Sequence, residues 1–158
     1  MTLRNERLLD QTGLRIIQAL QADGRLSFAE LGRQVGLTTP AVAERVRKLE
    51  EAGIIAGYHA QVPPARVSQP ILAFIRLTTT ADRYPRVLAL ARERPEFLEC
   101  HHVSGVESFI FKVVTTSVGH LETVIADLSP FGGTATSIVL SSPIARRAVE
   151  PGPPAEPV

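Results

Sequence analysis

The segment between residues 27 and 53 constrains the fold of this chain more than any other part of the sequence. Ser27 and Glu30 have the spacing of a capping box, in which a serine hydroxyl and a glutamate satisfy the first amides of a helix. Gly36 suits the left-handed residue that ends a short helix, and Thr39-Pro40 then begins another helix with proline at its first position. Gly53 ends that helix. We therefore predict a short helix, a tight turn and a longer capped helix.

This arrangement predicts a helix-turn-helix (winged-helix-like) domain, in which the second helix enters the major groove of duplex DNA. Gly32 provides the small side chain expected where the two helices cross, and Leu37 fills the core beside the turn. Val42, Val46 and Leu49 recur at helical spacing and form the predicted inward stripe. The competing interpretation is a helical hairpin whose charged face is only solvated.

Candidate DNA contacts lie on the outward faces of these two helices. Residues near the start of a recognition helix face base edges, where arginine can bond guanine and glutamate can accept from cytosine. The expected base readers are Thr39, Ala41, Glu44 and Arg45, with Thr38 or Thr39 as the helix cap. The cations expected to contact phosphates, which set register and salt dependence, are Arg33, Arg47 and Lys48.

Another helix is predicted before this pair, and a short strand after it. Asp10 occupies an N-cap position ahead of an apolar helical stripe that includes Ile16 and Leu20. Asp23-Gly24 ends that helix. Residues 54–58 follow the second helix of the pair and are predicted to form a short strand.

Prolines divide the chain into two domains. Three prolines between residues 63 and 70 break regular structure and mark a linker. We therefore predict a helix-turn-helix DNA-binding domain over residues 1–61, a linker over 62–70 and a second domain over 71–148. The proline-rich end, residues 149–158, is predicted to be a disordered tail.

The second domain alternates strand and helix. Strands are predicted over residues 71–79, 97–104, 108–116 and 135–142, and helices over 85–94 and 118–128. The order βαββαβ is that of the ferredoxin-like sandwich, a four-stranded antiparallel sheet with two helices on one face. The sequence therefore predicts an α+β protein.

Net charge argues against a single polycationic domain. The chain carries a formal charge of +1, with eight basic against seven acidic residues in 1–61 and nine against nine in 62–158. A positive surface for nucleic acid must therefore come from local placement of cations or from the assembly of several copies.

Other classes of function are disfavoured. The single cysteine, Cys100, excludes an internal disulfide, and side chains alternate across a strand, so Cys100, His101 and His102 cannot all reach one metal. His59 and His120 are isolated and expected at the surface. No glycine-rich phosphate loop or nucleophile–base–orienter set is visible, so neither catalysis nor a cofactor is expected. The sequence shows no membrane span or signal peptide, and we expect a cytoplasmic protein.

Motifs in both domains resemble those of a known family. The helical part contains Gln21-Ala22-Asp23-Gly24-Arg25-Leu26-Ser27 and Arg45-Val46-Arg47-Lys48-Leu49-Glu50-Glu51-Ala52-Gly53-Ile54-Ile55-Ala56-Gly57-Tyr58. The second part contains Cys100-His101-His102-Val103-Ser104-Gly105 and Phe109-Ile110-Phe111-Lys112-Val113. With these motifs the chain resembles the Lrp/AsnC (feast/famine) transcription regulators over roughly residues 8–148.

The resemblance implies a function and an assembly. It implies a transcription regulator whose second domain binds an effector, typically an amino acid, and forms homodimers that often close into octamers. The effector is expected between dimers, near the turn that joins the second and third strands. The implied effector residues are Gly105, Val106, Glu107 and Ser108, with Thr134, Thr136 and Ser137 as possible neighbours.

Two positions depart from the family pattern. Gly13 stands where an acid is common, and Ser108 stands where the turn usually carries an aspartate. An aspartate there would be a natural partner for the ammonium group of an amino acid, whereas Ser108 offers only a neutral hydrogen bond and Glu107 is the other source of charge. Two alternatives therefore stay open: an architectural protein that wraps DNA without an effector, and a ligand-binding sandwich whose helical domain contacts proteins.

Overall fold

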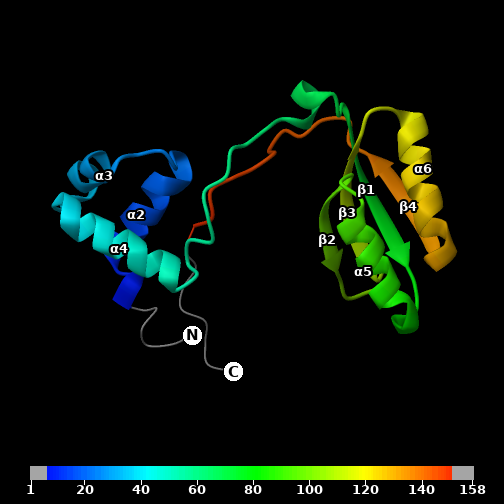
Figure 1. The fold of residues 1–158 in the computed structure, drawn as a ribbon, viewed down its shortest axis with the longest axis horizontal. Helices are drawn as coiled ribbons and strands as arrows, with labels where there is room; N and C mark the ends of the chain where they lie inside the picture. Colours follow the sequence, from blue (N-terminus) through cyan, green and yellow to red (C-terminus); the bar gives the residue numbers. More distant parts are fainter. Residues whose placement is uncertain (1–6, 151–158) are drawn as a thin grey trace. The chain divides into compact units, whose positions relative to one another are not determined.

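The computed structural model describes residues 7–150, which form two compact units (Figure 1). The first unit, the head, contains the described residues up to Ala60 together with residues 144–150, and the second, the sandwich, is Gln61–Pro143. The sandwich is therefore formed by the middle of the chain, and the described residues that follow it belong to the head again. No helix in the described range is long and apolar enough to cross a membrane. Most of the predicted tail, residues 151–158, lies outside the described residues.

Three helices form the head: α2 (Gln11–Ala22), α3 (Phe28–Val35) and α4 (Thr39–Glu51). Side chains fix where the first two begin. The Asp10 carboxylate accepts from the amide of Gly13 at 2.8 Å, and Ser27 and Glu30 form the predicted capping box. Gly36 ends α3 with φ of 75°, the left-handed conformation that the sequence predicted.

One apolar core joins the three helices. The predicted inward stripe of α4 is confirmed, because its members are buried among residues from α2 and α3. The fully or nearly fully buried residues are Ile16, Leu31, Val35, Val42, Val46 and Leu49. Burial of each such side chain is worth roughly 1.5–3 kcal/mol, so this cluster is the main source of the head's stability.

Two glycines of the head are required by close backbone contacts. A Cβ atom at Gly32 would lie 2.6 Å from the carbonyl oxygen of Leu37, and one at Gly13 would lie 1.8 Å from the carbonyl oxygen of Leu8. Gly32 therefore makes room for the turn after α3, not for a helix crossing as predicted. Gly13 is needed because the residues before α2 fold back over it.

Three further local predictions for the head differ from the structure. Residues 54–58 form no strand. The amides of Ile54 and Ile55 both donate to the carbonyl oxygen of Leu49, and the two side chains pack on the helical core, so the chain closes the end of α4 instead of extending. Thr38 precedes α4, but its side chain makes no capping hydrogen bond, and Pro40 is the second residue of the helix, not the first.

The sandwich has the predicted βαββαβ order. Its strands are β1 (Ile71–Thr78), β2 (Phe97–His102), β3 (Phe109–Thr115) and β4 (Gly133–Ile138), and its helices are α5 (Tyr84–Glu93) and α6 (Val118–Leu128). The strands form one antiparallel sheet in the order β2-β3-β1-β4, and both helices cover the same face (Figure 1). The core between the layers contains Ala73, Ile75, Leu77, Val87, Phe109, Phe111, Val113, Leu121, Val124 and Leu128. Short 3-10 turns lie at Pro64–Val67, Ala81–Arg83 and Ser129–Phe131.

The last strand begins and ends earlier than the predicted 135–142. Pairing with β1 starts at Gly133 opposite Thr78 and runs to Ile138 opposite Ala73. Only two residues of β1 precede Ala73, so the partner strand runs out and β4 ends. The Val139 amide still donates to the carbonyl oxygen of Leu72 at 2.8 Å, but β1 begins only one residue before Leu72, so the predicted strand cannot continue to residue 142 along it.

Gly13→Ala is expected to destabilise the head by roughly 1–3 kcal/mol, because the new methyl group would overlap the Leu8 carbonyl. Elsewhere in a helix this change is stabilising by up to about 1 kcal/mol. Gly119→Ala in α6 is the matched control, since a Cβ there meets only the Ser117 hydroxyl at 4.0 Å. Urea unfolding of the two variants measures both effects, and a Gly13→Ala protein as stable as the parent chain would contradict the proposed overlap.

Candidate nucleic-acid interface and effector region

The outward face of α4 displays most of the residues expected to contact DNA. Thr39, Ala41 and Glu44 are exposed on this helix, and Arg47 and Lys48 follow them toward its end. Arg33 is exposed on α3. These side chains therefore lie on helices whose inner faces are fixed by the buried core.

Arg45 is held differently from the other predicted base readers. Its two terminal nitrogens contact the two carboxylate oxygens of Asp10 at 2.7 and 2.8 Å, and its side chain is 34% exposed. The hydrogen bond from Arg45, followed by that from the Gly13 amide, lowers the pKa of the Asp10 carboxyl to about 2. The pKa of Arg45 is raised by the same contact. In this structure Arg45 therefore ties α4 to the start of α2.

Arg47 and Lys48 also have carboxylate partners on their own helix. Arg47 donates to the two oxygens of Glu44 at 2.7 and 2.9 Å and pairs with Glu51, and the Lys48 ammonium lies 3.3 Å from Glu44. Hydrogen bonds from Arg47 and then Lys48 lower the pKa of Glu44 to about 2. The outward face of α4 is thus an ion-pair network with little excess positive charge.

The turn predicted to lie near an effector joins β2 to β3. Its Ser108 is only 8% exposed, and its hydroxyl donates to the carbonyl oxygen of Thr79 at 2.8 Å and accepts from the Thr79 amide at 3.1 Å. The Ser108 amide donates to the carbonyl oxygen of Leu77 at 2.8 Å. Ser108 therefore fastens the turn to the end of β1. Glu107 is more open and lies 3.9 Å from Arg76.

The other residues of the predicted effector region do not share one face of the sheet. In the turn, Gly105 has φ of 120° and Val106 is 81% exposed. On β4, Thr134 pairs with Leu77 and Thr136 with Ile75, so both point toward the helices, whereas Ser137 pairs with Phe74 and points away. Thr134 is the member nearest the turn, because Leu77 also pairs with Phe109, the residue after Ser108.

The side chains of residues 100–102 alternate as predicted. Cys100 packs on the helix-side core, where burial raises the pKa of its thiol. The His102 ring lies 4.9 Å from that of Tyr84 and 5.1 Å from that of Phe109 on the same side. His101 faces the opposite side and contacts Glu99.

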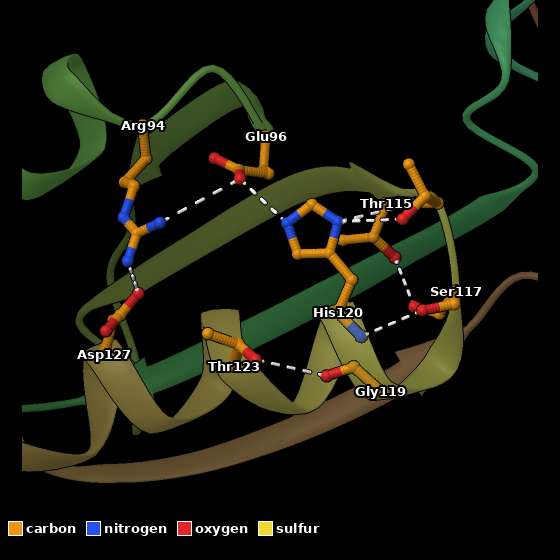
Figure 2. A network of polar contacts seen from close by, with 9 residues as sticks. Arg94, Glu96, Thr115, Ser117, Gly119, His120, Thr123 and Asp127 are labelled. Carbon is orange, nitrogen blue, oxygen red and sulfur yellow. Dashed lines mark hydrogen bonds and ion pairs between the residues drawn. The ribbon is translucent and has the colours of Figure 1, made fainter.

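His120, expected as an isolated surface residue, lies instead in a polar network (Figure 2). Its Nε2 is 2.9 Å from Glu96 Oε1, and its Nδ1 is 3.2 Å from the Thr116 hydroxyl. Arg94 lies 4.0 Å from Glu96 and also pairs with Asp127. Sequence reasoning missed this network because 24 residues separate His120 from Glu96.

The order hydroxyl, imidazole, carboxylate is also found in catalytic triads. Here, however, the Thr116 amide lies 3.4 Å from the same imidazole nitrogen, and His120 is the third residue of α6, whose amide is capped by Ser117. Burial raises the pKa of Glu96, but its own amide, His120 and Arg94 outweigh that effect and lower it. We interpret the network as an anchor between α6 and the turn before β2.

Two family models together match most of the chain. The AsnC-type helix-turn-helix domain matches residues 9–50, and the Lrp/AsnC ligand binding domain matches residues 72–149. Among curated proteins, the HTH-type regulator YezC of Bacillus subtilis is 40% identical over 85% of this chain and 95% of its own length. The regulatory protein AsnC of Escherichia coli is 31% identical over 88% of this chain and 95% of its own length.

Solved structures give the same result. LrpC of B. subtilis superposes with a TM-score of 0.83 at 33% identity, covering 87% of this chain and 99% of LrpC. The feast or famine regulatory protein Rv3291c of Mycobacterium tuberculosis, complexed with L-methionine, superposes with a TM-score of 0.82 at 30% identity, covering 90% and 99%.

Asp10→Asn tests the contact with Arg45 without removing the helix cap, because asparagine caps as well as aspartate. The ion pair is partly exposed, so we expect a loss of only about 0.5 kcal/mol in the free energy of unfolding at pH 7. Because folding lowers the Asp10 pKa from 3.8 to about 2, its contribution is present above pH 4 and is lost as the pH falls toward 2. Urea unfolding across this range should show the two proteins converging at low pH; a gap that widens there would exclude this role for Asp10.

Proposed function

The chain belongs to the Lrp/AsnC family of transcription regulators, and we propose that it acts as an assembly in which pairs of α4 helices bind a pseudo-palindromic operator. The observation that carries this proposal is the pair α3 and α4, with the capping box, the Gly36 turn and the buried stripe that hold α4 outward. Thr39, Ala41 and Glu44 are the proposed base contacts, and Arg33, Arg47 and Lys48 the proposed phosphate contacts.

The ion pairing of the α4 cations supports the proposal that two or more copies must assemble to bind DNA tightly. The cations of α4 are paired with carboxylates of the same head, so the α4 helix of one copy offers little uncompensated positive charge. Phosphate neutralisation supplies a large part of the affinity of most DNA-binding proteins. Two heads on one DNA combine their contacts, and the linkage between them raises the effective concentration of the second.

The uncovered face of the sheet supports a homodimer formed through the sandwich. Leu72, Phe74 and Ile110 lie on the face opposite the helices, and Phe74 is 39% exposed. Apolar side chains gathered on one face mark interaction surfaces, and aromatic residues are enriched there. We infer that a second copy packs on this face. The family resemblance extends this assembly to an octamer of four dimers.

An amino acid is the proposed effector, because Rv3291c is complexed with L-methionine. The proposed site is the turn from Gly105 to Ser108, with Thr134 beside it. The Ser108 hydroxyl is already bonded to Thr79, so Glu107 is the proposed partner of the ammonium group. An effector that binds one arrangement of dimers more tightly than another favours that arrangement. It can change the DNA affinity by no more than the difference between its binding free energies for the two arrangements.

The engagement of Ser108 also favours a second candidate function. A turn that offers no aspartate and whose serine is occupied within its own copy fits a protein that wraps DNA without a small-molecule effector. In that case the octamer would serve only to bend and organise DNA.

Replacing both Arg45 and Lys48 with alanine is expected to abolish binding to promoter fragments in gel-shift or fluorescence-anisotropy assays. Asp10→Asn separates the two roles of Arg45, because it releases the guanidinium without removing it. If Arg45 contacts DNA, the Asp10→Asn protein binds DNA at least as tightly as the parent chain. If Arg45 acts only through Asp10, the Asp10→Asn protein binds DNA more weakly than the parent chain, as the double variant does. Unchanged binding by the double variant would contradict the proposed function.

Thermal unfolding in the presence of each of the twenty amino acids tests the effector. We expect one or a few of them to raise the midpoint, since a ligand bound only by the folded state stabilises it by mass action. Glu107→Gln should remove that rise without lowering the midpoint of the free protein by more than about 1 °C. A flat response across all twenty favours the architectural alternative.

A further inference from the structure

Residues 144–150 return to the head and are fastened there by one side chain. The amide group of Gln21, on the last turn of α2, accepts from the Val149 amide at 2.8 Å and donates to the Val149 carbonyl oxygen at 3.0 Å. The two residues are 128 positions apart in the sequence. The Val149 side chain is 75% exposed, so the contact depends on its backbone.

This contact brings two arginines to the head. Arg146 and Arg147 precede Val149 by three and two residues, and an extended chain spans at most about 3.6 Å per residue. Their Cα atoms therefore lie within about 11 and 7 Å of that of Val149. Both residues are exposed, and in the part of the chain that the structure describes no ion pair joins either of them to a carboxylate.

Arg146 and Arg147 differ from the cations of α4 in having no carboxylate partner among the described residues. Arg45, Arg47 and Lys48 each have a carboxylate partner, so contact with a phosphate must compete with an existing ion pair. Arg146 and Arg147 have no such competitor in residues 7–150. Compared with the cations of α4, Arg146 and Arg147 are therefore better placed energetically to take up a phosphate.

The anchor also lies on the helix that precedes α3, the helix expected to cross DNA. Gln21 is followed by the short loop that carries the exposed Arg25, and then by α3. In a helix-turn-helix the helix before the recognition helix crosses the sugar-phosphate backbone. The C-terminal segment is thus fastened at the end of α2, which directly precedes that helix in the sequence.

We propose that Arg146 and Arg147 form an additional phosphate-binding element of the head, held in place by Gln21. The inference rests on the proposed binding of duplex DNA. The contacts are to the backbone, so they add affinity and salt dependence without adding sequence preference.

The test is the salt dependence of DNA binding by the full chain. For Arg146→Ala/Arg147→Ala, the plot of log K against log salt should become less steep by about one for each arginine in each bound head. Affinity should fall by the same factor for operator and unrelated duplex. The control is Arg86→Ala/Arg92→Ala on α5 of the sandwich, which removes the same charge from two exposed positions. It should leave the slope unchanged.

Gln21→Ala tests the anchor, because it keeps both arginines and removes their attachment. Its slope should fall between those of the parent chain and the double variant. A slope unchanged in the Arg146/Arg147 variant, or lowered equally by the α5 control, would overturn the inference while the parent chain still binds DNA. Failure of the parent chain itself to bind any duplex at low salt would instead overturn the proposed function, and this inference with it.

Discussion

The carboxylate of Asp10 connects two helices of the head and holds the guanidinium of Arg45. One of its oxygens caps α2 through the Gly13 amide, and both oxygens receive the guanidinium of Arg45 from α4. The first and last helices of the head are therefore joined through one charged group, outside the apolar core. Because Arg45 is committed to Asp10 and Arg47 to Glu44, α4 presents balanced charge to its surroundings. This balance is the reason for our proposal that one head alone binds DNA weakly and that assembly is needed.

A comparable role falls to Ser108 in the sandwich. Its hydroxyl satisfies both the amide and the carbonyl group of Thr79, so the β2–β3 turn is fixed against the end of β1 from within one copy. The hydroxyl of Ser108 has already donated its proton and used one of its two acceptor lone pairs within its own turn, and it offers a ligand no charge. For the proposed amino-acid effector, the negative charge that pairs with the ammonium group would come from Glu107, whose environment already includes Arg76.

Local features of the sequence predicted the fold well, and contacts between distant residues account for some of what was missed. Capping boxes, turn glycines and apolar periodicity act over a few residues, and they located α3, α4, the four strands and both sandwich helices. Arg45 pairs with Asp10, 35 residues away, and His120 pairs with Glu96, 24 residues away. No local sequence pattern predicts either pairing. The strand predicted over 54–58 failed for a more local reason: its apolar residues suit a strand, but the amides of Ile54 and Ile55 bond to Leu49 and their side chains pack on the helical core.

The path of the chain has a consequence for the order in which a new copy becomes complete. Ribosomes release the N-terminal helices first, and their core can close before the sandwich exists. Val149, however, reaches Gln21 only when nearly the whole chain has been synthesised. A nascent chain thus carries a folded but unfinished head until the sandwich has been made. If copies pair through the sandwich, as proposed above, the head is completed only when the pairing domain is already present.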